Sequence, residues 1–110
     1  MGEQLMNRRL TLDKTLRSIV KDRCGQENVY YQPPVRLQMK YPCICYERSK
    51  IRNLAANDKV YLQRFFYSIT VIDKDPDSEM AAAVSQLSKC EHDRHFISDG
   101  LHHDVFTIYY

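Results

Sequence analysis

The hydrophobic pattern is clearest along Tyr61–Ile72, where it predicts a long β-strand with one buried face. Successive side chains of a strand point to opposite faces, so every second residue lies on the same side. The odd positions are apolar except for Gln63, whereas the even positions mix polar and apolar residues. Aromatic and β-branched residues, which are typical of strands, are frequent here. We therefore expect one face to contact a core and the other to be half exposed.

A helix is predicted near the N-terminus, over Thr11–Arg23. Its apolar pattern extends upstream to residues 5 and 6. Gly25 is the expected end of the helix, because glycine adopts the left-handed conformation without steric cost. The apolar stripe that must pack on a core consists of Leu12, Leu16, Ile19 and Val20.

A second, shorter helix is predicted directly after the long strand. Asp75 is the expected N-cap and Pro76 the expected first helical residue. Asp73, Asp75 and Asp77 alternate as in calcium-binding loops, but the glycine and the distal glutamate of such loops are missing, so capping explains them better. The stripe expected to pack on the preceding strand consists of Met80, Ala83, Val84 and Leu87.

Four further segments have strand character. Tyr41–Arg48, Cys90–Phe96 and Leu101–Tyr110 are the longer ones. Asn28–Gln32 is a short segment whose following prolines confine it to the edge of a sheet, because proline cannot donate to a ladder. Leu101–Tyr110 is apolar on both faces, so we expect it to be central in its sheet or covered by a neighbouring subunit.

Between two of the main strands, Ser49–Lys59 is polar and predicts a long hairpin loop. Loops of this length exceed the usual hairpin connection and are often functional. The whole pattern predicts an α+β fold: an antiparallel sheet of about four strands, two helices packed on one face, and this loop between the first two main strands. At 110 residues, the chain is expected to form a single domain over residues 1–110.

Composition excludes several classes of protein. The net charge of +2 is too small to require a nucleic-acid partner. No apolar run approaches the roughly 18 residues of a membrane helix, and the N-terminus lacks the apolar core of a signal peptide. We therefore expect a cytoplasmic protein without membrane contact. The residues expected to be reduced thiols, because their spacing fits neither zinc knuckles nor redox motifs, are Cys24, Cys43, Cys45 and Cys90.

The histidines are the most tempting candidates for a metal site. His92 and His95 lie close to His102 and His103 if the last two strands pair through the turn at Ser98–Gly100. Zinc needs three or four ligands that converge at about 2.0–2.3 Å. On regular strands, however, the two members of each pair point to opposite faces, so at most half the set shares a face. We expect surface or subunit-contact histidines, and a small metal-binding or hydrolytic domain is the alternative.

No other motif predicts catalysis. There is no nucleophile elbow and no phosphate-binding glycine loop, so we expect a protein that is not an enzyme and has no cofactor. The basic residues of Arg48–Lys59, with Tyr46 and Tyr61 nearby to stack on bases, leave a nucleic-acid binder as a further alternative. Eight tyrosines and four phenylalanines exceed what two short helices can cover, which favours self-assembly.

The order of elements resembles that of the tail terminator proteins (tail completion, or tail-to-head joining) of long-tailed bacteriophages. The local amino-acid sequence is similar to that of proteins encoded in the head–tail gene block of phages and prophages of Gram-positive bacteria. None of the similar segments encodes a chemistry, so they form a family signature rather than a mechanism. These segments are Val35–Ile44 with Tyr46–Arg48, Tyr67–Asp73 with Pro76–Ser78, and Asp93–Phe96 with Leu101–Phe106.

The resemblance implies a structural virion protein that forms a ring, expected to be a hexamer. Such a ring caps the tail tube, joins it to the head-completion (stopper) protein, and lets genomic DNA pass through its lumen without sequence-specific binding. Its place is the tail–neck junction of the virion, after assembly in the bacterial cytoplasm. A head-completion or neck connector protein is the close alternative. No catalytic or metal residue is implied. The expected interface residues are Arg48, Lys50, Ile51, Arg52, Asn53, Leu54, Lys59, Tyr61, Tyr109 and Tyr110.

Overall fold

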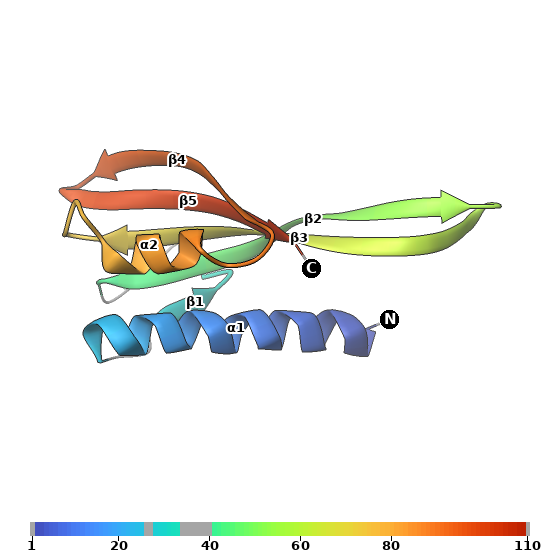
Figure 1. Ribbon diagram of the computed structural model, residues 1–110, viewed down its shortest axis with the longest axis horizontal. Helices are drawn as coiled ribbons and strands as arrows, with labels where there is room; N and C mark the ends of the chain where they lie inside the picture. The colour runs from blue at the N-terminus through green and yellow to red at the C-terminus, as the bar shows by residue number, and fades with distance from the viewer. Residues whose placement is uncertain (1, 26–27, 34–40, 110) are drawn as a thin grey trace.

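Two helices and a five-stranded sheet make up the part of the chain that this computed structural model describes, residues 2–25, 28–33 and 41–109 (Figure 1). For residues 2–8, 24, 56, 60 and 61 only the backbone is described. This is an α+β architecture. In chain order the elements are α1 (Gly2–Cys24), β1 (Val29–Tyr31), β2 (Cys43–Ala56), β3 (Lys59–Asp73), α2 (Glu79–Ser85), β4 (Cys90–Ser98) and β5 (Leu101–Tyr109).

The strands lie in the order β1-β2-β3-β5-β4, and the sheet is mixed rather than wholly antiparallel. β1 pairs parallel with β2 through Val29 and Ile44, whereas the other three pairings are antiparallel. The expected sheet of about four antiparallel strands was therefore wrong in one respect: the observed sheet has a fifth strand at its edge, and that strand is parallel to its neighbour. A three-residue apolar segment carries no signal of its direction, so only the pairing reveals it.

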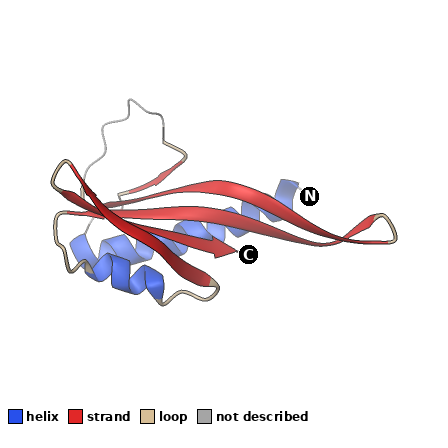
Figure 2. Ribbon diagram, turned by 90° about the horizontal axis from the view of Figure 1, so that it is seen from above, coloured by secondary structure: helices blue, strands red, loops and turns tan. Residues whose placement is uncertain are grey.

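The prediction of a long loop over Ser49–Lys59 was wrong, because β2 and β3 stay paired as far as Ala56 and Lys59. Asn57 and Asp58 close the hairpin with φ angles of 53° and 60°. A two-residue hairpin turn of this kind needs positive φ at both positions, which asparagine and aspartate tolerate. The hairpin extends beyond the other strands (Figure 2), and its described side chains from Ser49 to Leu62 are exposed on both faces, so its sequence lacks the alternation that marks a half-buried strand.

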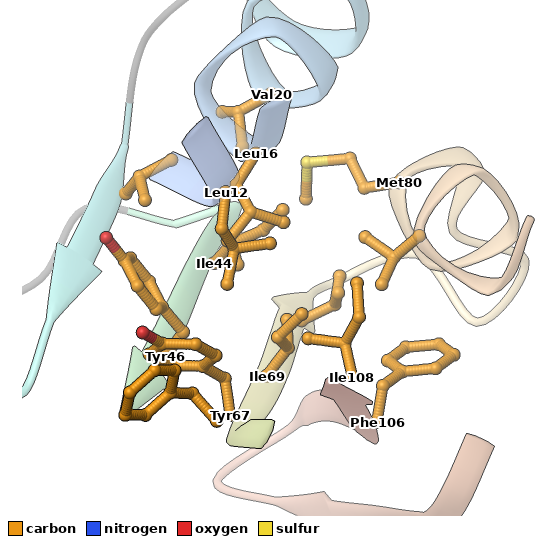
Figure 3. Close-up of a cluster of buried hydrophobic side chains, with 14 residues drawn as sticks. Leu12, Leu16, Val20, Ile44, Tyr46, Tyr67, Ile69, Met80, Phe106 and Ile108 are labelled. Carbon is orange, nitrogen blue, oxygen red and sulfur yellow. The ribbon is translucent and has the colours of Figure 1, made fainter. Parts of the chain in front are cut away.

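One buried cluster combines side chains of both helices with side chains of the sheet (Figure 3). The cross-strand partners Ile44–Val71, Tyr46–Ile69 and Ile69–Phe106 place these sheet residues on a single face. The predicted burial of Leu12, Leu16 and Val20 is confirmed, as is that of Met80 and Val84 and of the odd positions from Phe65 to Val71 of β3, whereas the side chain of Tyr61 lies outside the described residues. The cluster also buries the aromatic rings of Tyr46, Phe65, Tyr67 and Phe106.

Two expectations about local structure are resolved. β5 lies between β3 and β4, which explains why it is apolar on both faces without a neighbouring subunit. The N-cap of α2 is Ser78, not Asp75: its Oγ accepts from the Ala81 N–H at 3.3 Å. Asp73 and Asp75 instead accept from backbone N–H groups two residues further on, at 3.1 and 2.9 Å, which holds the chain in turns before the helix begins.

Candidate functional site

The outer half of the β2–β3 hairpin, residues 49–65, projects from the body of the molecule, and we call it the arm (Figure 1). β5 pairs with β3 only from Phe66 to Asp73, and β1 pairs with β2 only along Ile44–Tyr46. Within the described residues the arm has no third strand beside it. α1 runs along the base of the arm (Figures 1 and 2), where Phe65 is buried in the core cluster, so only the part beyond Phe65 is a bare two-stranded hairpin. An isolated two-stranded hairpin is marginally stable in water, so a long one without internal support suggests an external partner.

Two bulges shape the arm. Ser49 is the extra residue where it leaves the body, and its Oγ donates to the Phe66 carbonyl at 3.1 Å. Tyr61 is the extra residue near the tip. Each bulge bends the strand and increases its twist. The bulge at Ser49 shifts the alternation of side chains by one residue. Odd and even residue numbers therefore do not show which residues of the arm share a face.

Apolar side chains stand on both faces of the arm in solvent. Ile51 is opposite Phe65 on the face that continues the core, and Leu54 is opposite Leu62 on the other face. Ile51, Leu54 and Leu62 are 42%, 49% and 38% exposed. Single exposed apolar residues are ordinary, but the facing pair Leu54 and Leu62 forms a small apolar surface on one face that can contact another protein, and Ile51 stands on the opposite face.

The structure places most of the expected interface residues on the arm or at its base. Arg48–Leu54 lie on β2, and Lys59 lies beside the tip. Tyr109 ends β5 opposite Phe66, at the base. Tyr61 has only its backbone described, and Tyr110 lies outside the described residues. The expectation that Tyr46 could stack on bases was wrong, because this side chain is buried in the core.

Cations gather over two aromatic rings at the base of the arm. Lys50 Nζ lies 4.9 Å and Arg52 Cζ 5.9 Å from the centre of the Phe66 ring. Arg64 Cζ lies 5.1 Å and Lys89 Nζ 5.7 Å from that of Tyr109, and the two ring centres are 5.5 Å apart. Cations over ring faces are attracted by the ring quadrupole. We call this set the cation–aromatic patch; its members are Lys50, Arg52, Arg64, Phe66, Lys89 and Tyr109.

The sequence prediction missed three members of this patch. Arg64 and Phe66 are even positions of the long strand, on the face opposite the core, so the alternation could have placed them together. Lys89 follows α2, and its carbonyl accepts from the Tyr109 N–H at 3.3 Å, which brings it beside the end of β5. No pattern in the sequence indicates that approach.

A second group of polar side chains lies on β4 and β5. Asp104 Oδ1 accepts from His92 Nε2 at 3.1 Å and from His95 Nδ1 at 2.8 Å, and His102 Nδ1 is 3.3 Å from His95 Nε2. The expectation that His92 and His95 point to opposite faces was wrong, because a bulge between His92 and Arg94 adds a residue. Even so, no group of three or more His, Cys, Asp or Glu side chains in the described part of the chain could hold a metal ion.

The described cysteines are free thiols with different acidities. The Cys43 thiol hydrogen-bonds Cys45, which raises the pKa of Cys43 and lowers that of Cys45. Burial, followed by the nearby Asp93 and Glu91 carboxylates, raises the pKa of Cys90 from 9.0 to about 11. Cys43 and Cys90 are therefore protonated at neutral pH and poor nucleophiles. The Cys24 side chain lies outside the described residues.

Comparison with known proteins gives no relative: no family model matches the chain, and no curated protein matches it. Within the described residues, neither helix combines the length and the apolarity needed to cross a bilayer.

Proposed function

We propose that this chain is a structural subunit that works by binding copies of itself and neighbouring proteins, as the ring-forming tail terminator of a long-tailed bacteriophage. In this proposal a hexameric ring caps the tail tube, stops its growth, and offers a docking surface to the head-completion protein. Genomic DNA passes through its lumen. The subunit is assembled in the bacterial cytoplasm and resides at the tail–neck junction of the virion.

The observation that carries the proposal is the arm. It exposes Ile51, Leu54 and Leu62 on a two-stranded hairpin whose described side chains beyond Phe65 are outside the core cluster. We infer that both helices cover one face of the sheet, which leaves the other face and the outer part of the arm open to partners. The number of aromatic residues no longer supports self-assembly by itself, because Tyr46, Tyr67 and others are buried within the subunit.

In this proposal the chain is not an enzyme, and its action depends on the fit between surfaces. A head-completion or neck connector protein would use the arm in the same way, but it would bind the head side of the junction. The alternative of a metal-binding domain has no converging set of ligands among the described residues to support it.

Electron microscopy of the protein mixed with purified tail tubes tests the proposal. The decisive variant replaces residues 52–64 with Asn-Gly, which joins the directly paired residues Ile51 and Phe65 through a two-residue turn. Leu10→Ser is the control, because Leu10 on α1 is 42% exposed, like Ile51, but is not part of the arm. We expect wild type and L10S to form rings at tube ends and the shortened variant to form none. A wild-type protein that stays monomeric and never occupies tube ends would refute the proposal.

A further inference from the structure

The cation–aromatic patch holds charges in an arrangement that is unfavourable for the isolated chain. Arg52 and Arg64 are directly opposite each other across β2 and β3, on the face away from the core. Lys50 lies on the same face in the neighbouring row, opposite Phe66. Like charges that face each other across a strand pair destabilise it. An anion bound between them would remove this repulsion.

Among the described residues, no carboxylate is paired with a cation of the patch. The ion pairs among the described residues join Arg17 to Asp13, Arg23 to Glu79, and two histidines to Asp104, and none of them includes a cation of the patch. Carboxylates on the same face belong to a separate row, in which Glu47 and Glu91 flank Ser68 and Thr107 and Asp93 accepts from Thr107 Oγ1 at 2.6 Å. The net charge of +2 for the whole chain thus conceals a local segregation of charge.

We propose that the cation–aromatic patch binds the sugar–phosphate backbone of DNA. Guanidinium groups bind phosphate oxygens in a bidentate manner, and the Phe66 and Tyr109 rings beneath the cations restrict their orientation. Residues on one face of a strand recur about every 7 Å, so the Arg52–Arg64 row and the Lys50 row present cations in succession to a linear array of phosphates.

DNA fits this surface better than an acidic protein segment does. Four cations converge on two rings, and their rows follow one another at the regular strand spacing, which suits the regularly spaced phosphates of a nucleic-acid strand. The carboxylates of an acidic peptide have no such fixed spacing. This assignment rests on the proposed function, because the DNA that the patch would contact is the DNA inside the proposed ring.

Fluorescence anisotropy with a labelled 20-nucleotide single strand and the corresponding duplex tests the assignment on the full-length chain. The variant is Arg52→Gln with Arg64→Gln, and the control is Lys14→Gln with Lys74→Gln, which removes the same charge from exposed positions outside the patch. We expect the patch variant to bind at least tenfold more weakly and the control to change binding less than twofold. The slope of log K against log salt concentration should fall in magnitude by about 2 in the patch variant, because the protein then neutralises two fewer phosphates.

Two further measurements keep the assignment falsifiable. Lys89→Gln, in a turn outside the arm, should weaken binding in the same direction, which covers the case in which the arginine variant fails to fold. Polyglutamate of matched charge should compete poorly with DNA. Absence of binding, equal loss in patch and control variants, or equal competition by polyglutamate would overturn the assignment. Rings on tube ends without DNA binding would overturn this assignment alone, whereas DNA binding without rings would overturn only the proposed function.

Discussion

Removing the exposed leucine pair of the arm should separate assembly from folding. In Leu54→Ala with Leu62→Ala, two side chains that face each other and are 49% and 38% exposed lose most of their apolar surface. Full burial of a leucine contributes about 1.5–3 kcal/mol, and these two side chains are about half buried and lie outside the core cluster. Alanine retains part of that burial, so we expect the free energy of unfolding to fall by about 1–2 kcal/mol for the double variant, compared with about 2–5 kcal/mol for Leu16→Ala in the core.

Self-association should be affected strongly by this double substitution. Truncating two apolar side chains at an interface should raise the dissociation constant at least tenfold, which corresponds to about 1.4 kcal/mol. Urea unfolding followed by circular dichroism measures the free energy of unfolding, and sedimentation velocity measures the dissociation constant of self-association. Leu10→Ala is the control, because its side chain is 42% exposed on α1. A loss of stability as large as that of L16A would show that the arm belongs to the cooperative core, and unchanged association would show that the leucine pair lies outside the interface.

The remaining predictions concern the turn, the core and the thiols. Asp58→Gly should slow hydrogen exchange of the arm amides, because glycine suits the positive φ of this turn; unchanged or faster exchange would contradict the turn assignment. Tyr46→Phe, which removes the hydrogen bond to Asp13, should cost about 1–3 kcal/mol in urea unfolding. Burial and Asp13 raise the pKa of Tyr46 above 10.0, so wild-type stability should fall above pH 10 and Y46F should flatten that fall. The raised pKa of Cys90, about 11 against 9.0, should add a loss of stability as pH rises from 9 through 11, and Cys90→Ala should remove it.

The core could be predicted from the sequence because its residues obey regular periods. The spacing of Leu12, Leu16 and Val20 matches a helix, and the alternation from Phe65 to Val71 matches a strand with one buried face. These patterns depend on a boundary between core and solvent. The arm has no such boundary, and its strands were therefore mistaken for a loop, although Asn57 and Asp58 carried the signal of a tight turn.

The candidate sites were harder to predict because bulges change parity. Single extra residues at Ser49 and Tyr61, and between His92 and Arg94, move side chains to the opposite face without leaving a mark in the hydrophobic pattern. The grouping of the histidines around Asp104 was missed for this reason. The cation–aromatic patch also depends on Lys89 reaching Tyr109, a contact between segments that only the fold brings together.

The proposed function depends above all on contact between the arm and another copy of this chain. A photo-cross-linking amino acid at position 54 tests it directly in the assembled protein, with the same substitution at Leu10 on α1 as the control. We expect covalent products between copies, extending to the hexamer, from position 54 and none from position 10. Only uncross-linked monomers from position 54, under conditions in which the protein is assembled, would contradict it.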